Sequence, residues 1–187
     1  MTNGRRGVFF LGLLALTGLS LSVNSADRSR RFWANLDGYQ EVPSTLSTPA
    51  SGEFEARLAQ NGNIEYELNY SGFATAVTAS HIHLGRPGTA GGVIAFLCGG
   101  GDKPACPQGS GTVTGTIDPA DVVGPAAQGI AAGEFEELLA AMRAGATYVN
   151  VHSATYPGGE IRGLIRGFRG GDRGRGRPGD GAGEWDY

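Results

Sequence analysis

The chain has 187 residues, 33 of them glycine and only one lysine, with 40% hydrophobic residues, 18% charged residues and a formal net charge of -3. This length suits one domain with appended segments. The apolar content and the lack of a Gly-X-Y period exclude a fully disordered chain and a collagen, and the small negative charge provides no basic field for nucleic acid, which we do not expect as a partner.

Residues 1–26 predict a secretory signal peptide. Two arginines precede an apolar run over residues 8–16 that continues more weakly to Val23, and small residues follow. A transmembrane anchor needs about 20 apolar residues, and polar residues interrupt this run earlier. We therefore expect cleavage after Ser25 or Ala26, no membrane anchor in the mature chain, and export to the periplasm or the extracellular space. The paired arginines leave twin-arginine export open as an alternative route.

Residues 53–70 carry the clearest strand pattern, because apolar and polar residues alternate on both sides of Asn61-Gly62. Asn-Gly favours a type I′ turn, so we expect an antiparallel hairpin with one covered face. The fold class predicted for residues 27–167 is all-β, an antiparallel Greek-key-like sandwich or barrel of about seven to nine strands. Further strands are predicted at residues 31–36, 77–84, 93–97, 112–117, 147–152 and 160–165.

Cys98 and Cys106 are the two cysteines of the chain. Disulfides persist in exported proteins, so we expect these residues to pair and to close a short loop. A structural zinc site needs further cysteines nearby, and a redox pair normally has closer spacing, so neither alternative is favoured.

Residues 134–144 predict one short amphipathic helix, since apolar side chains repeat at helical spacing, glutamates occupy the first turn, and Arg143 and Gly145 close the last turn. Its apolar stripe is expected to cover a sheet edge or one end of a barrel. Residues 168–187 are rich in glycine, arginine and aspartate and have no periodic apolar face. We predict that they form a disordered tail.

All three histidines of the chain lie in two predicted strands. His81 and His83 are two residues apart, so in a strand their imidazoles point to the same face. A third imidazole from His152 on a neighbouring strand completes a three-histidine set, which suits copper or zinc, and the affinity order favours copper. We expect the affinity for metal to fall as the pH decreases through the histidine range near about 6.5.

Several polar residues near the predicted histidine site can line it or support its ligands. An alternative interpretation makes the three histidines ordinary hydrogen-bonding residues of a half-buried face, with no metal. A serine hydrolase is not favoured, because Ser80 and Ser153 point to the opposite strand faces and no Gly-x-Ser-x-Gly motif is present. The candidate lining residues are Tyr148, Asn150, Tyr156, Glu160 and Arg162.

Three motifs stand out along the chain. They are FWANLDGYQEV at residues 32–42, HIHLG followed by Pro-Gly at residues 81–88, and the block at residues 148–163 that contains YVNVHS and YPGGEIRG. With these motifs the chain resembles the CHRD domains, a family named for the repeats of chordin and common in secreted bacterial proteins. The resemblance spans about residues 32–167, and the tail has no counterpart in it. It implies an all-β extracellular domain, and it implies no single biochemical activity.

The histidine pattern is also similar, more loosely, to that of the copper/zinc superoxide dismutases. These proteins place a His-x-His pair and a distant strand histidine around copper on an antiparallel β-barrel. His81, His83 and His152 match those positions in kind. The chain shows no match for the histidine that bridges copper to zinc or for a zinc-binding aspartate, so a two-metal dismutase site is not predicted.

Three functions remain open at this point, and none of them assigns a catalytic residue. The first is a copper-binding protein for storage, delivery or sensing. The second is a metal-free extracellular protein-binding or adhesion module, and the third is a copper-only redox enzyme in which Arg86 or Arg162 steers a small anion. Candidate contact residues for an extracellular protein partner are the aromatic side chains of Trp33, Tyr39, Trp185 and Tyr187.

Overall fold

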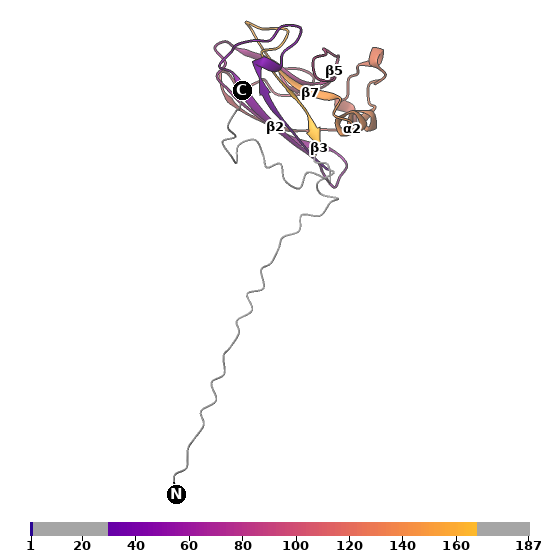
Figure 1. Cartoon of the computed structure of the whole chain (residues 1–187). Coiled ribbons are helices and arrows are strands. Elements are labelled where there is room, and N and C mark those ends of the chain that lie inside the picture. Colours follow the sequence, from indigo (N-terminus) through magenta and orange to yellow (C-terminus); the bar gives the residue numbers. More distant parts are fainter. Residues whose placement is uncertain (2–29, 168–187) are drawn as a thin grey trace.

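The computed structural model describes residue 1 and residues 30–167, so the predicted tail and all but one residue of the predicted signal peptide lie outside the described residues. The described part is mostly β, with one α-helix and three short 3-10 helices (Figure 1). None of its helices is long and apolar enough to span a membrane. The strands are β1 (Arg31–Asp37), β2 (Ser51–Leu58), β3 (Ile64–Ser71), β4 (Val77–Leu84), β5 (Val93–Cys98), β6 (Gly111–Ile117), β7 (Thr147–Ser153), β8 (Ile161–Leu164) and β9 (Arg166–Gly167), and the helices are η1 (Gly38–Gln40), η2 (Pro119–Asp121), η3 (Ala126–Gln128) and α2 (Phe135–Arg143).

The nine described strands form one antiparallel sheet in the order β5-β4-β7-β8-β1-β2-β3-β6, with β9 added beside β1. Four pairings join strands that are not consecutive in the chain, namely β4 with β7, β1 with β8, β1 with β9 and β3 with β6. The outermost strands β5 and β6 contact each other, so the sheet is nearly closed into a barrel. The predicted all-β class, with antiparallel strands and a single α-helix in the described part, is confirmed.

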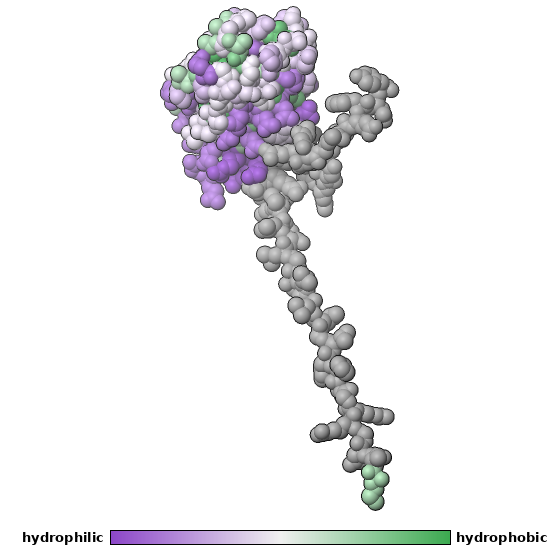
Figure 2. Space-filling model, turned by 90° about the vertical axis from the view of Figure 1, so that its left-hand side faces the viewer, coloured by the Kyte–Doolittle hydropathy of each residue, from purple (hydrophilic) through white to green (hydrophobic). Residues whose placement is uncertain are grey.

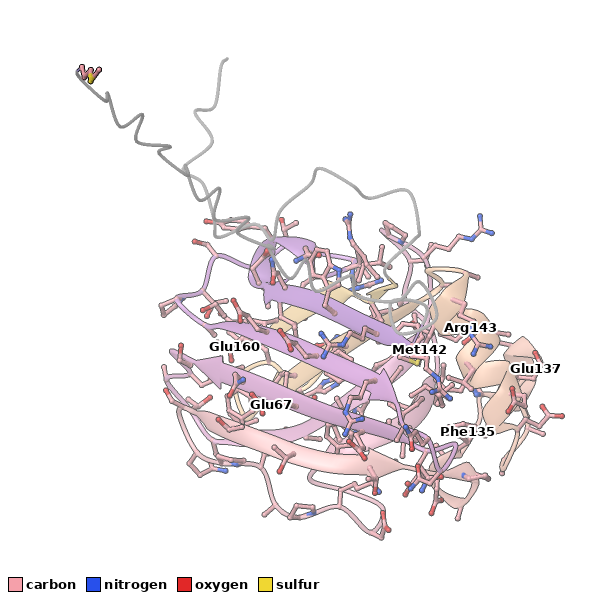
Figure 3. All side chains as sticks on the ribbon, turned by 90° about the horizontal axis from the view of Figure 1, so that it is seen from below. Glu67, Phe135, Glu137, Met142, Arg143 and Glu160 are labelled. Carbon is pink, nitrogen blue, oxygen red and sulfur yellow. A yellow bond between two sulfur atoms is a disulfide. The ribbon has the colours of Figure 1, made fainter. Side chains whose placement is uncertain are left out.

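The barrel interior follows from alternation along the strands. In β2 and β3 the apolar side chains of Phe54 and Leu68 pair across the ladder and are fully buried, while the intervening residues face outward. Figure 3 shows Glu67 on this outer surface, among other polar side chains. Tyr66 also points inward, and its hydroxyl donates a hydrogen bond of 2.8 Å to the carbonyl oxygen of Leu97, which links β3 to β5 across the interior.

The hairpin is confirmed, but the predicted type I′ turn is wrong. Leu58 pairs with Ile64, which leaves five connecting residues instead of two. A type I′ turn needs a positive φ at both central residues, whereas in this loop only Gly62 has one, at 90°. The Asn61 side chain accepts a hydrogen bond from the backbone N–H of Asn63, so the asparagine stabilises a longer loop through its side chain.

The predicted helix is confirmed as α2, one residue shorter at each end than expected. Its buried residues are Phe135, Leu138, Leu139 and Met142, and all four belong to the main hydrophobic core. The helix lies beside the strands, and its labelled residue Glu137 faces away from them (Figures 1 and 3). The apolar stripe is therefore used within the fold.

The predicted disulfide is also confirmed, because Cys98 and Cys106 are bonded. Cys98 ends β5 and Cys106 precedes β6. The bond therefore lies within the loop that connects these two outermost strands of the sheet. Both residues are buried.

Replacing both cysteines by serine should lower the free energy of unfolding by about 2 to 3 kcal/mol, because the bond closes a short loop and constrains the unfolded chain. The bond spans a sequence separation of 8. Urea unfolding of the oxidised wild type and of the Cys98→Ser/Cys106→Ser variant measures the difference. Equal midpoints and slopes for the two proteins would contradict this prediction.

Candidate metal centre

The pairing of β4 with β7 places the three histidines on the outer face of the sheet. Ile82 pairs with Val149, and both side chains are fully buried in the interior. Because side chains alternate, the neighbouring residues of each strand point outward. His81 pairs with Asn150, and the ring of His152, two residues further along β7, lies diagonally across from His81.

The three imidazoles lie together, as predicted. One ligand nitrogen from each ring can be chosen so that all three lie within 4.8 Å of one another. The closest pair joins Nδ1 of His81 to Nε2 of His152 at 3.1 Å. Bonds of about 2.0 to 2.1 Å to a shared ion require nitrogens no more than about 4.2 Å apart. A small adjustment of the side chains therefore brings all three nitrogens to one ion.

Backbone carbonyl groups fix the proton positions of two rings. Nδ1 of His83 donates to the carbonyl oxygen of Gly91, and Nδ1 of His152 donates to that of Pro157, each at 3.0 Å. A carbonyl only accepts, so both rings carry their proton on Nδ1 and have a lone pair on Nε2. Nε2 of His152 accepts from Nδ1 of His81, whereas Nε2 of His83 is buried and has no partner. Carbonyls in these positions orient ligand histidines in metalloproteins.

Burial keeps these rings neutral. Burial, helped by the nearby His152, lowers the pKa of His81 to about 3 and that of His83 to about 4, the latter against the opposing effect of its bond to Gly91. The pKa of His152 is lowered by the same burial, against the opposing effect of its bond to Pro157. The sequence-based expectation of a loss of affinity near pH 6.5 assumed solvated rings. In the folded protein the imidazoles of His81 and His83 are available as neutral ligands well below that pH.

Aromatic side chains pack around the histidines. The ring of Tyr148 stacks on His83 with 4.9 Å between centroids and 6° between planes, and its hydroxyl accepts a bond from the backbone N–H of Gly91. The edge of Phe96 meets His81 at 4.6 Å between centroids. Tyr148, a predicted lining residue, thus contacts His83, and Phe96, which the histidine motif gave no reason to expect, contacts His81.

Arg162 ties the β4–β5 loop to the site. Its guanidinium lies 3.5 Å from the centroid of the Tyr148 ring, and Nη2 donates to the carbonyl oxygens of Arg86 and Thr89. This loop also carries Gly91, the acceptor for His83. Arg162 is only 3% exposed. Arg162 is therefore a buried residue that holds the β4–β5 loop through hydrogen bonds. Arg86, by contrast, is exposed at the surface.

The other predicted lining residues have partners other than the histidine rings. Asn150 donates to a carboxylate oxygen of Glu41 at 3.4 Å, and the carboxylate of Glu160 accepts from the hydroxyl of Thr48. Tyr156 lies in the β7–β8 loop and lines a cleft of about 240 Å³. Glu41, which sequence reasoning passed over, belongs to the motif at residues 32–42 and lies 109 positions from Asn150, so no local pattern reveals their contact.

Two of the four aromatic residues considered for a protein partner belong to the described part of the chain. Tyr39 is 69% exposed, whereas Trp33 is half-buried with Arg166 beside its ring. Trp185 and Tyr187 lie outside the described residues. The face of the domain in Figure 2 is mostly hydrophilic or neutral, with small separate apolar areas.

Comparison with protein families places these features in context. The family model of the CHRD domain matches residues 32–165, which include all three histidines. The chain belongs to the CHRD family. No curated protein and no solved structure is significantly similar to it. Membership of the CHRD family and the Cys98–Cys106 bond are both consistent with an extracellular domain.

Acid should destabilise the metal-free protein through the histidines. Their unfolded pKa is about 6.5, while burial holds that of His83 at about 4 when the chain is folded. Below pH 6.5 the unfolded chain takes up protons that the folded chain does not, so stability present above pH 6.5 is lost as the pH falls towards 4. We expect the melting temperature of chelator-treated protein to fall between pH 7 and pH 5.

A variant with His83→Gln and His152→Gln provides the comparison for this pH dependence. It should show a smaller decrease in melting temperature over the same interval, because two of the three linked groups are gone. An unchanged slope in the variant, or a wild type that gains stability on acidification, would rule out the linkage.

Proposed function

We propose that this CHRD domain is an exported protein that binds a single copper ion through His81, His83 and His152, for storage, delivery or sensing of the metal. The observation that carries the proposal is the buried, unpartnered Nε2 of His83. A buried acceptor without a partner costs free energy. A metal ion at this position would use that lone pair together with the two nitrogens beside it.

The chemistry of the ligands favours copper over other divalent ions. Three neutral imidazoles suit both copper and zinc, and the affinity of nitrogen sites rises to a maximum at copper in the first-row series. The sulfur atoms of both cysteines are in a disulfide, so no thiolate competes for the ion in the described part of the chain. Zinc is the alternative where copper is scarce.

Two features support the metal-binding function over a metal-free histidine cluster. The His83 and His152 rings are oriented by the backbone carbonyls of Gly91 and Pro157, so that the Nε2 lone pair of His83 is unpartnered and that of His152 faces His81. In addition, desolvation already holds the rings in the neutral form that a metal requires. A histidine cluster that served only packing would need neither the unpartnered lone pair of His83 nor three imidazole nitrogens close together.

Copper titration of the chelator-treated mature chain, purified without a histidine tag, tests the proposal. We expect one Cu(II) per chain and a higher melting temperature in its presence, since an ion that binds only the folded state stabilises it. The His83→Ala variant should lose most of the binding, because two imidazoles form a weak site. The Tyr39→Ala variant, altered at an aromatic residue that is 69% exposed, should bind as the wild type does.

Unchanged melting of the wild type with both Cu(II) and Zn(II) would end the metal hypothesis. In that case the metal-free protein-binding module takes its place. Equal loss of binding in the Tyr39 control would show instead that the assay reports general damage to the fold.

The β4–β5 loop should contribute to metal affinity through the acceptor for His83. A side chain at Gly91 would overlap the carbonyl oxygen of Leu84, so the loop would have to move, whereas a side chain at Gly88 meets no atom within 4 Å. Gly91→Ala should therefore lower metal affinity by about 10-fold or more, as changes to groups that orient ligands commonly do. Gly88→Ala, whose φ of 75° carries its own strain, is the matched loop control and should leave the affinity nearly unchanged.

Isothermal titration with Zn(II) measures both variants under the same conditions. Equal affinities for the Gly91→Ala variant and the wild type would show that the loop carbonyl does not support the ligand.

A further inference from the structure

Glu41 is a buried carboxyl group on the same outer face as the histidines. It follows helix η1 and is 4% exposed. One oxygen, Oε2, accepts a long bond of 3.4 Å from Nδ2 of Asn150, while Oε1 has no partner. Oδ1 of Asn150 is also buried without a partner. Oε1 of Glu41 and Oδ1 of Asn150 are thus both buried without a hydrogen-bond donor. Burial of an ionised carboxylate in such surroundings costs free energy.

The charged groups around Glu41 do not neutralise it. Arg162 on β8 is near enough to favour its ionised form, but the described ion pairs do not include these two residues. The guanidinium of Arg162 is engaged by two loop carbonyls and by the ring of Tyr148. Glu160, the nearby carboxylate, accepts from Thr48. Burial raises the pKa of Glu41 to about 7, because it outweighs the bond from Asn150, the charge of Arg162 and the bond from the backbone N–H of Val42.

Only one side chain separates Glu41 from the candidate metal ligands. Asn150, its partner, is directly opposite His81 in the β4–β7 ladder and two residues before His152 on the same face of β7. A divalent ion among three neutral imidazoles adds two positive charges close to the buried Arg162. No Asp or Glu belongs to the described group of metal-holding side chains. A negative charge at Glu41, which contacts Asn150 beside the histidines, can therefore compensate the ion.

We propose that Glu41 stores a proton while the histidine site is empty and releases it when a divalent ion binds, so that the carboxylate compensates the charge of the ion. In this step the O–H bond of the carboxyl group breaks, the proton passes to solvent, and no electron is transferred. Glu41 lines the cleft of about 240 Å³ between the β1–β2 and β7–β8 loops, which gives the proton a way out. The inference rests on the proposed metal-binding function.

Proton counting separates Glu41 from the ligands. At pH 6 the imidazoles of His81 and His83 are already neutral, so they have no proton to lose on binding. Calorimetric titration of Zn(II) into the chelator-treated mature chain, in two buffers of different ionisation enthalpy, gives the number of protons released. We expect about one proton per ion for the wild type at pH 6, and an affinity that rises about tenfold per pH unit between pH 5 and 6.5.

The Glu41→Gln variant should still take up one ion but release about one proton fewer, with little change of affinity over the same pH range. The Glu53→Gln variant, which removes an exposed carboxylate from the outer face of β2, is the matched control and should release as many protons as the wild type. Equal proton release by the Glu41→Gln variant and the wild type overturns the inference, even though metal binding stands. Absence of Zn(II) and Cu(II) binding by the wild type overturns the proposed function itself.

Infrared difference spectroscopy on the wild type keeps the inference testable should the Glu41→Gln variant fail to fold. Addition of Zn(II) at pH 6 should remove the band of a protonated carboxyl group. A spectrum without that loss contradicts proton storage at Glu41.

Discussion

The register between β4 and β7 is the constraint on which the candidate site depends. Ile82 pairs with Val149 in the interior, and this buried pair fixes which residues of both strands face outward. A slip of one residue in either strand would exchange the two faces. The ring of His152 would then enter the core and its aliphatic neighbours would be exposed, so the burial of the aliphatic row also determines the position of the imidazoles.

The sequence predicted the individual strands and the helix better than it predicted which strands lie side by side. Alternation and helical spacing predicted the strands, the helix and the shared face of His81 and His83, because these are properties of a few consecutive residues. That β7 lies beside β4 was an assumption, since some sixty residues separate the two strands and no local pattern specifies their pairing. The turn at Asn61-Gly62 shows the same limit on a smaller scale, because the register of the ladder decided the length of the loop.

The parts of the site that the sequence did not reveal come from loops. An antiparallel sheet commonly has one face in water, but here loop residues such as Gly91, Pro157 and Glu41 enclose part of the outer face. These loop residues bury polar side chains of the strands, and buried polar groups need hydrogen-bond partners. Three of the four buried side-chain atoms without partners in the described residues belong to His83, Glu41 and Asn150. The buried polar atoms without hydrogen-bond partners are thus concentrated at and beside the histidines.

The same cover acts in opposite directions on the two kinds of titratable group. Desolvation disfavours whichever form is charged, so it lowers the pKa of the histidines and raises that of Glu41. At pH 6 the imidazoles of His81 and His83 and the carboxyl group of Glu41 are then mostly neutral. Arg162 keeps its positive charge, and its guanidinium contacts two carbonyl oxygens and an aromatic ring. An enclosure with one fixed positive charge resists a cation unless some group nearby becomes negative. Among the enclosed residues Glu41 alone combines a shifted pKa with an unpartnered oxygen, so the charge balance of the site depends on a residue outside the histidine motif.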